Sequence, residues 1–118
     1  MTFDYFYGSA ADQHSFFRIP KCLMRDEYAS LSVQAKLLYG LLLDRMGLSM
    51  HNKWIDEENR VFVIYQISEI QADLNISRRK AIECLNELEA CGLVMKRTRG
   101  YGMPNLLYPS NFMTMQPA

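Results

Sequence analysis

The chain has 118 residues, 49% of them hydrophobic, and its 13 basic and 13 acidic side chains give a formal net charge of zero. This length suits one domain, and the apolar content is enough for a buried core, which argues against a disordered chain. The longest apolar run, LLYGLLL at residues 37–43, is too short to cross a membrane. The N-terminus also lacks the basic and apolar segments of a secretory signal, so we expect no membrane partner.

The three cysteines and two histidines are not spaced as metal ligands. Cys22, Cys84 and Cys91 form no CxxC pair, and both histidines are distant from them in the sequence. We therefore expect no metal and no other cofactor, and we interpret the thiols as small buried or half-buried side chains of a cytoplasmic protein. No catalytic motif is present, and the acidic triplet at residues 56–58 is typical of a solvated turn, so we predict no enzymatic activity.

The composition along the chain predicts three parts. We expect an N-terminal arm at residues 1–15, a folded domain at residues 16–112 and a C-terminal tail at residues 113–118. The arm is expected to lie over the core or over a partner subunit, because its aromatic density exceeds that of a loose tail. Its aromatic residues are Phe3, Tyr5, Phe6 and Tyr7.

The folded domain begins with a short extended segment that Pro20 ends, and a strong helix pattern follows. Ser32 is a candidate N-cap of this helix, and Gly47 follows its last turn as a stop signal. Apolar positions cover most of the helix circumference, so we expect the helix to be central and buried. These positions are Val33, Leu37, Leu38, Tyr39, Leu41, Leu42 and Leu43.

A hairpin is predicted by the stretch NKWIDEENRVFVIY, in which an acidic turn joins a short strand at Trp54 to a β-rich run. A short helix is predicted by the next stretch, SEIQADL. Ser68 is its expected N-cap, and Ile70 and Leu74 are expected to face inward.

A tight turn at Asn75 and Ile76 then leads to Ser77, the expected N-cap of a helix at residues 78–91 that Gly92 ends. Two strands are predicted in LVMKRTR and LLYPSNF, joined by the hairpin loop GYGMPN. The order of helix, strand, helix, turn, helix, strand, loop and strand is that of a winged helix-turn-helix. This is an α+β fold with a three-helix core, a small antiparallel β-sheet and one wing.

Although the net charge is zero, the charges are segregated along the chain. Residues 1–76 carry seven basic and ten acidic side chains, whereas residues 77–105 carry six basic and three acidic ones. A local basic patch is the usual electrostatic feature of a nucleic-acid surface. Arg78, Arg79 and Lys80 begin the predicted helix, where the helix dipole disfavours positive charge. Bound DNA would offset this cost.

At 100° per residue, the predicted helix at residues 78–91 has two distinct faces. The face expected to pack on the core consists of Ala81, Cys84, Leu85 and Leu88. The opposite face consists of Arg79, Glu83, Asn86 and Ala90.

In a helix-turn-helix protein the second helix enters the major groove with its N-terminal residues against base edges. Arg79 is then the best-placed base reader, because a guanidinium can bond guanine O6 and N7 together. Arg78 and Lys80 are expected to hold phosphates, aided by the backbone N–H groups that follow Ser77. The DNA-binding residues that we predict on this helix are Ser77, Arg78, Arg79, Lys80, Glu83 and Asn86.

The predicted wing carries a second basic cluster. After Met95 the apolar alternation ends, so this strand is expected to leave the core and form the stalk of the wing. Lys96, Arg97 and Arg99 would straddle the DNA backbone, and Tyr101 at the tip would touch sugar or phosphate.

Either basic cluster alone is more typical of a solvated surface than of a binding site. Both together, on the recognition helix and wing of one motif, favour double-stranded DNA as the partner. The main alternative is a winged helix that docks proteins.

Three stretches, FFRIPKCL, LSVQAKLLYGLLLDRMGLSMHNKWIDEENRVFVIY and ISRRKAIECLNELEACGLVMKRTRGYGMPNLLYPSNF, carry a family resemblance. Together, over residues 16–112, the sequence resembles the N-terminal domain of the plasmid replication initiator protein A (RepA) family. The segment AKLLYGLLLDRMGLS followed by WIDEENRVFVIY is not shared by winged helices in general.

The resemblance implies a cytoplasmic initiator that binds repeated sites at a plasmid replication origin, usually as a homodimer. It also implies that a full-length member has a C-terminal domain that engages host replication proteins. By match to the family motif, the recognition helix falls on residues 77–91 and the wing on residues 96–107. A transcription regulator or protein-docking module without a role in replication remains the alternative.

Overall fold

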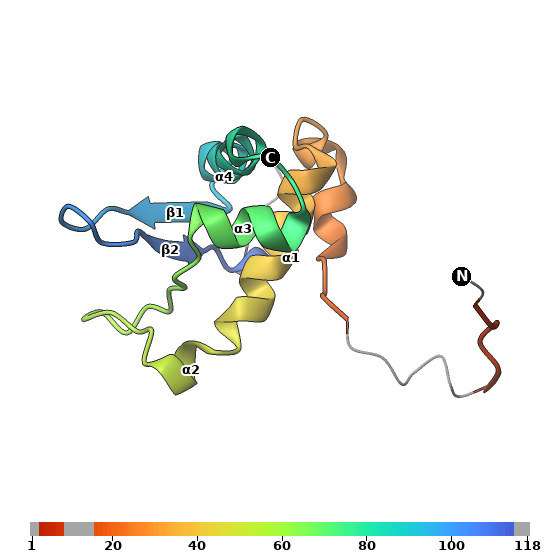
Figure 1. The fold of residues 1–118 in the computed structure, drawn as a ribbon, viewed down its shortest axis with the longest axis horizontal. Helices are drawn as coiled ribbons and strands as arrows, with labels where there is room; N and C mark the ends of the chain where they lie inside the picture. Colours follow the sequence, from red (N-terminus) through yellow and green to blue (C-terminus); the bar gives the residue numbers. More distant parts are fainter. Residues whose placement is uncertain (1–2, 9–15, 115–118) are drawn as a thin grey trace.

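Three main helices and a two-stranded antiparallel sheet form the fold. The computed structural model describes residues 3–8 and 16–114. The helices are α1 (Val33–Met46), α2 (Ser49–Asn52), α3 (Ile67–Leu74) and α4 (Arg78–Ala90), and the strands are β1 (Val94–Arg97) and β2 (Leu106–Pro109). Short 3₁₀ helices lie at Lys21–Met24, Asp26–Tyr28 and Phe112–Thr114. In Figure 1, α1, α3 and α4 lie together and the β1–β2 hairpin projects from them as a wing, so the predicted α+β winged helix-turn-helix is confirmed.

The central helix α1 begins and ends where the sequence predicts. Ser32 caps it, because Ser32 Oγ accepts a hydrogen bond from the Ala35 N–H at 3.1 Å, and Gly47 follows its last turn. Val33 is 70% exposed and Leu37 is 41% exposed, so the expected burial is wrong at these two positions. The reason is that α3, α4 and β2 contact α1, and the face turned away from them stays in solvent. The residues that α1 buries are Ala35, Leu38, Tyr39, Gly40 and Leu42.

A residue from α4 adds a second cap to the start of α1. The Glu87 carboxylate accepts hydrogen bonds from the Ser32 backbone N–H at 2.7 Å and from the Ser32 hydroxyl at 2.8 Å. A helix N-terminus carries a partial positive charge, so a carboxylate is stabilised there. This contact joins α4 to the start of α1.

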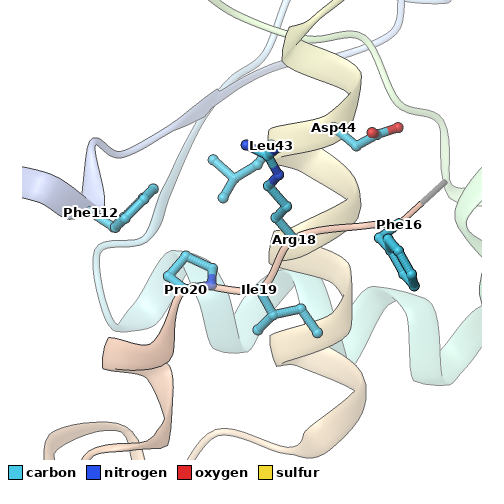
Figure 2. A pocket seen from close by; sticks show the side chains of 7 residues that line it. All are labelled: Phe16, Arg18, Ile19, Pro20, Leu43, Asp44 and Phe112. Carbon is cyan, nitrogen blue, oxygen red and sulfur yellow. The ribbon is translucent and has the colours of Figure 1, made fainter. Parts of the chain in front are cut away.

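The segment before α1 crosses the helix at a residue without a side chain. A Cβ atom on Gly40 would lie 3.1 Å from the Arg18 carbonyl oxygen and 3.1 Å from Ile19 Cγ1, so the segment lies directly against the helix. Its residues 16–20 have no regular secondary structure, and a 3₁₀ helix starts directly after Pro20, which agrees with the predicted extended segment. Figure 2 shows the segment crossing α1 beside a pocket.

The predicted hairpin that follows α1 is present in a reduced form. One antiparallel bridge between Ile55 and Val61 joins its two arms, and a second bridge from Val63 to Leu107 attaches it to β2. Because these bridges are isolated, neither arm forms a strand of the length that the β-rich pattern predicts. The short helix α2 precedes the hairpin and is not predicted by the sequence pattern.

The helix α3 starts before Ser68, so the predicted N-cap is wrong. Gln66 occupies the N-cap position, and its backbone N–H donates to the Glu69 carboxylate at 3.0 Å. A Gln–Glu pair at this spacing satisfies the free N–H groups of a helix start, and Ser68 therefore lies inside the helix. The predicted inward positions are confirmed, since Ile70 is fully buried and Leu74 packs against the core.

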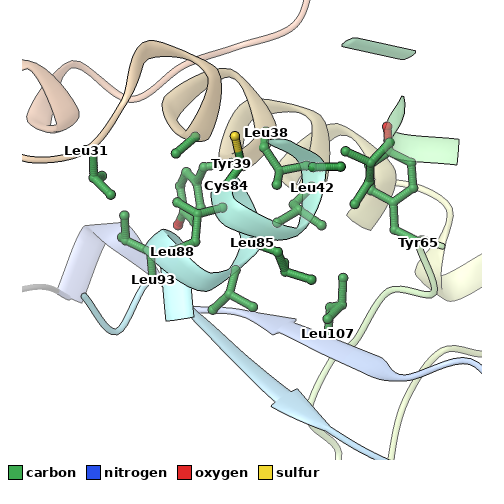
Figure 3. Packing of buried hydrophobic residues seen from close by; sticks show 14 of the residues in the cluster. Leu31, Leu38, Tyr39, Leu42, Tyr65, Cys84, Leu85, Leu88, Leu93 and Leu107 are labelled. Atoms are coloured by element: carbon green, nitrogen blue, oxygen red, sulfur yellow. The ribbon is translucent and has the colours of Figure 1, made fainter. Parts of the chain in front are cut away.

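The predicted turn and second strong helix are also confirmed. Asn75 has a left-handed conformation (φ 55°), and Ser77 Oγ caps α4 by accepting the Lys80 N–H at 3.1 Å. The helix ends at Ala90, one residue before its predicted end, and Gly92 follows with φ +86°. The inner face of α4 packs among the side chains of α1, as Figure 3 shows. Its residues, each 7% exposed or less, are Ala81, Cys84, Leu85 and Leu88.

The wing is a two-stranded hairpin as predicted. Its strands pair antiparallel, from Val94 opposite Pro109 to Arg97 opposite Leu106. Beyond β2, the buried Tyr39 hydroxyl of α1 donates to the Ser110 carbonyl oxygen at 2.5 Å. Burial raises the pKa of Tyr39 to about 12, so this hydroxyl remains a donor at neutral pH.

The aromatic side chains of the arm do not cover the core. They are 69–85% exposed, so the expectation that the arm lies over the core is wrong for residues 3–8, whereas the expected contact with a partner subunit stays a prediction. Aromatic density alone does not specify the surface that a segment contacts. These side chains are Phe3, Tyr5, Phe6 and Tyr7. Residues 1–2 and 9–15 of the arm and 115–118 of the tail lie outside the described residues, so the two predicted boundaries between the three parts stay predictions.

One of the three thiols differs from the expected burial. Cys84 is buried and Cys22 is half-buried, but Cys91 is exposed. Because α4 ends at Ala90, Cys91 lies beyond the inner face of the helix.

The acidic turn at residues 56–58 is not uniformly solvated. The Asp56 side chain is 2% exposed, and it accepts hydrogen bonds of 2.8–2.9 Å from the Glu58 and Arg60 backbone N–H groups, Arg60 Nε and the Tyr108 hydroxyl. Burial opposes ionisation, but the hydrogen bonds from Arg60, Tyr108 and Glu58 lower the pKa of Asp56 to about 2. The interpretation as a solvated turn is therefore wrong for Asp56, which holds the turn against β2.

We expect Glu87→Ala to lower the free energy of unfolding by about 1–3 kcal/mol, because it leaves the Ser32 N–H without its acceptor and removes a charged cap. Urea denaturation measures this change. Glu89→Ala is the matched control on the same helix, since its contact with Lys96 is a loose ion pair of 3.9 Å, and it should change stability by less than about 0.5 kcal/mol. Equal losses in the two variants would contradict a special role for Glu87.

We expect Asp56→Asn to lower the melting temperature most at neutral pH. The folded pKa of Asp56 is below that of an unfolded aspartate, about 3.9, so its ionised form stabilises the fold above that pH. This stabilisation is lost as the pH falls toward 2, and the melting temperatures of wild type and variant should therefore converge between about pH 4 and 2. Glu58→Gln, at a side chain 67% exposed, is the control and should have little effect. A wild-type to Asp56→Asn difference that stays constant with pH would overturn the prediction.

Candidate nucleic-acid interface

The outward face of α4 is open to solvent, as its sequence predicts. The Arg79 side chain is 90% exposed and the Glu83 side chain is 50% exposed. Asn86 and Ala90 are exposed on the same side. Because these residues follow one another at intervals of three or four, they form a row along the helix that can face a groove of DNA.

Ser77 and the two cations beside Arg79 have different surroundings. The oxygen of Ser77 caps α4 by accepting the Lys80 N–H, which leaves its hydroxyl proton to be donated to a ligand. Lys80 is half-buried, with 33% of its side chain exposed, and Arg78 is exposed. The N–H groups of the first helical turn point away from the helix body, as an anion site requires.

Glu83 lies between two of these cations. Its Oε1 is 3.3 Å from Arg79 Nε, and its Oε2 is 4.0 Å from Lys80 Nζ. The structure thus brings together Arg79, Lys80 and Glu83 in one cluster, which we call the α4 charge cluster.

A groove of about 290 Å³ separates the start of α4 from the wing loop. Arg78 lines it, together with polar side chains that the sequence reasoning missed: Gln66, Ser68 and Asn105. The loop composition GYGMPN predicts a hairpin, but only the tertiary fold brings Asn105 into the lining of the same groove as Arg78. A groove between helix-turn-helix and wing is where a DNA backbone would run if α4 enters the adjacent major groove.

The wing cations do not lie together, because successive residues of a strand point to opposite faces. Lys96 Nζ is 3.9 Å from Glu89 Oε1 of α4, on one side of the wing. Arg97 is 3.3 Å from Glu57 of the acidic turn, on the other side. The sequence reasoning did not identify either carboxylate as a partner, because each is distant in the chain or on another element.

The remaining wing residues lie near the tip. Arg99 Nε donates to the Pro104 carbonyl oxygen at 3.0 Å, so this residue braces the loop of the wing. Tyr101 is fully exposed at the tip, where it is predicted to contact DNA.

Within residues 3–8 and 16–114, no three or more His, Cys, Asp or Glu side chains are grouped to hold a metal ion. In the same part of the chain, no helix is both long and apolar enough to cross a membrane.

Solved structures with the same fold include a protein described as the N-terminal domain of a DNA binding protein. It is 30% identical, with a TM-score of 0.76, and the match covers 93% of this chain and 85% of that chain. A second, described as the structure of a Rep-DNA complex, is 29% identical with a TM-score of 0.78, and covers 96% and 88% of the two chains. A third, described as the structure of an MDR initiator, is 31% identical with a TM-score of 0.72, and covers 98% and 88%.

Among curated proteins, a 41 kDa protein of Lactobacillus helveticus is 28% identical over 104 residues, which cover 86% of this chain. The match spans only 30% of the length of that relative. The model of one protein family, described as the N-terminus of replication initiator protein A (RepA), matches residues 15–118. The chain therefore belongs to the RepA N-terminal family of replication initiators.

Proposed function

We propose that this domain binds double-stranded DNA in a sequence-specific manner and so recognises repeated sites at a plasmid replication origin. The observation that carries the proposal is the similarity, over 96% of this chain, to the protein in the Rep-DNA complex. Membership of the replication initiator family and the similarity to an MDR initiator support the link to replication.

The exposed row on α4 supports its insertion into the major groove. Arg79, which is 90% exposed near the start of the helix, would donate two hydrogen bonds to guanine O6 and N7. Arg78 and Lys80 would hold phosphates on either side, and Ser77 would donate its hydroxyl proton to a phosphate oxygen. Asn86, one turn further along than Glu83, would contact a base edge, for which adenine offers the matching donor and acceptor.

The ion pairs of the cations do not prevent this role. The pairs of Arg79, Lys96 and Arg97 are at least partly exposed to solvent, and such pairs contribute at most about 1 kcal/mol. A phosphate can therefore replace the carboxylate. In the bound state Lys96 and Arg97 would contact DNA phosphates beside the groove. Arg99 and Tyr101 would contact the DNA backbone from the wing loop.

The wider assembly is part of the same proposal. The exposed aromatic residues of the arm support a homodimer in which the arm of one copy contacts the other, since isolated tails seldom expose so much aromatic surface. The greater length of the curated relative supports a further region that engages host replication proteins. The domain would act in the cytoplasm by binding alone, without enzymatic activity.

Duplex affinity should fall steeply with salt. If four to six phosphates are contacted, the slope of log affinity against log salt should be roughly −4 to −5. Fluorescence anisotropy with a labelled duplex measures this slope. A flat response, or no binding at low salt, would refute the DNA proposal and favour a winged helix that docks proteins.

Arg79→Ala and Arg97→Ala should have different effects. Loss of the base-reading guanidinium in Arg79→Ala should weaken the binding free energy by about 1–3 kcal/mol on a duplex that the wild-type protein selects from a random pool. The loss on random duplex should be much smaller. Loss of Arg97 should weaken both kinds of duplex by similar factors and lessen the salt slope by about one unit. The measurement is the ratio of selected to random affinity for each variant. Equal ratios would mean that α4 is not the reading helix, and a loss of selectivity in Arg97→Ala alone would assign reading to the wing.

A further inference from the structure

Glu83 is an acidic residue on the face that the proposed function turns toward DNA. Its carboxylate is shared between Arg79 at 3.3 Å and Lys80 at 4.0 Å, in the α4 charge cluster. It is half exposed and points along the outward row of the helix. A carboxylate in this position repels phosphates, so its presence requires an explanation.

Helix stability does not supply that explanation. Pairs of this kind stabilise a helix less when the cation precedes the anion, which is the order of Arg79 and Glu83. The helix dipole favours acidic residues only within the first turn, and Glu83 lies beyond it. An exposed pair with a 90% exposed arginine also contributes little to the fold.

DNA binding would separate the charges of this cluster. When Arg79 turns to a base and Lys80 to a phosphate, the Glu83 carboxylate loses both partners and faces the groove. Phosphates cannot replace these partners. In the major groove, the groups that can are the exocyclic amines, and the one that pairs with a carboxylate is cytosine N4.

We infer that Glu83 is a specificity-determining residue that accepts a hydrogen bond from a cytosine amine in the major groove and penalises binding to backbone alone. This inference rests on the proposed function and deepens it. Four residues of helix separate Glu83 from Arg79 by about 6 Å, or roughly two base-pair steps of 3.4 Å. The cytosine should therefore lie within about two base pairs of the guanine that Arg79 reads.

The test uses the 118-residue chain and a duplex selected from a random pool by the wild-type protein. Each C·G pair of that duplex is replaced in turn by T·A, which exchanges the cytosine amine for a carbonyl oxygen. Wild type should lose about tenfold in affinity or more at one position near the Arg79 guanine, because a carboxylate then faces an acceptor. The affinity of Glu83→Ala should stay unchanged on the exchange at that position, whereas exchanges at other positions should still weaken its binding.

A charge-matched pair of variants separates reading from general electrostatics. Glu83→Gln and Glu57→Gln each remove one carboxylate from an ion pair of 3.3 Å, the first within α4 and the second between the acidic turn and Arg97 of the wing. Glu83→Gln should strengthen binding to random duplex and lower the ratio of selected to random affinity by about tenfold. Glu57→Gln should strengthen binding to both duplexes alike and leave the ratio unchanged. Melting curves check that both variants fold, as expected for exposed side chains.

The outcomes distinguish this inference from the proposed function. If wild type prefers no duplex, the proposed function fails. Suppose that wild type is selective but that every C·G exchange affects wild type and Glu83→Ala equally, or that Glu83→Gln keeps the wild-type ratio of selected to random affinity. Only the role of Glu83 is then overturned. Coupling to an A·T pair instead would overturn the assignment to cytosine.

Discussion

The orientation of α4 about its own axis depends on the contact between the Glu87 carboxylate and Ser32 at the start of α1. On the helix, Glu87 lies at the edge of the buried face, beside Cys84, so a polar anchor and an apolar face act together. A rotation by one residue position, 100°, would break both hydrogen bonds and turn Leu88 toward water. The outward position of Arg79 and Glu83 therefore follows from the burial of the opposite, apolar face of α4 and from the Glu87 anchor at the side of the helix.

The position of the wing is set by a different part of the chain. Asp56 accepts the Tyr108 hydroxyl, the Phe62 ring packs edge-on against Tyr108 at 5.9 Å, and the Arg60 guanidinium lies 5.2 Å from the centre of the same ring. These contacts attach the acidic turn to one face of β2. Of the four hydrogen bonds that Asp56 accepts, the one from the Tyr108 hydroxyl reaches β2, and the three from Glu58 and Arg60 hold the turn itself in shape. Because the Asp56 side chain is nearly inaccessible to water, its bond to Tyr108 is screened less than the exposed Arg97 to Glu57 pair.

The features that sequence predicted correctly are local ones. Ser32, Ser77, Asn75 and Gly92 act within one turn of their own position, so their residue types suffice to place the ends of α1, α3 and α4. The prediction of Ser68 as the N-cap of α3 was wrong for a related reason, because Gln66 and Glu69 form a capping pair that starts the helix two residues earlier.

The interactions that sequence did not predict join distant parts of the chain. Glu87 reaches Ser32 over 55 positions, Arg97 reaches Glu57 over 40, and Asp56 reaches Tyr108 over 52. No local pattern contains such pairs. The outward row of α4 could be predicted because helix periodicity separates its faces, whereas the opposite directions of Lys96 and Arg97 depend on where β1 lies between α4 and the acidic turn.

The charge distribution also constrains how a domain of this kind could select a site. With a net charge of zero and several cations already paired to carboxylates, the long-range attraction to any duplex is small. The phosphate contacts of Lys80, Lys96 and Arg97 must first displace a carboxylate partner, which reduces the gain from backbone binding. Under the proposed function, discrimination would therefore come as much from weakening random binding as from strengthening the correct contacts. Glu83 would contribute to both effects, because the same carboxylate that repels phosphates is able to accept a hydrogen bond from a base amine.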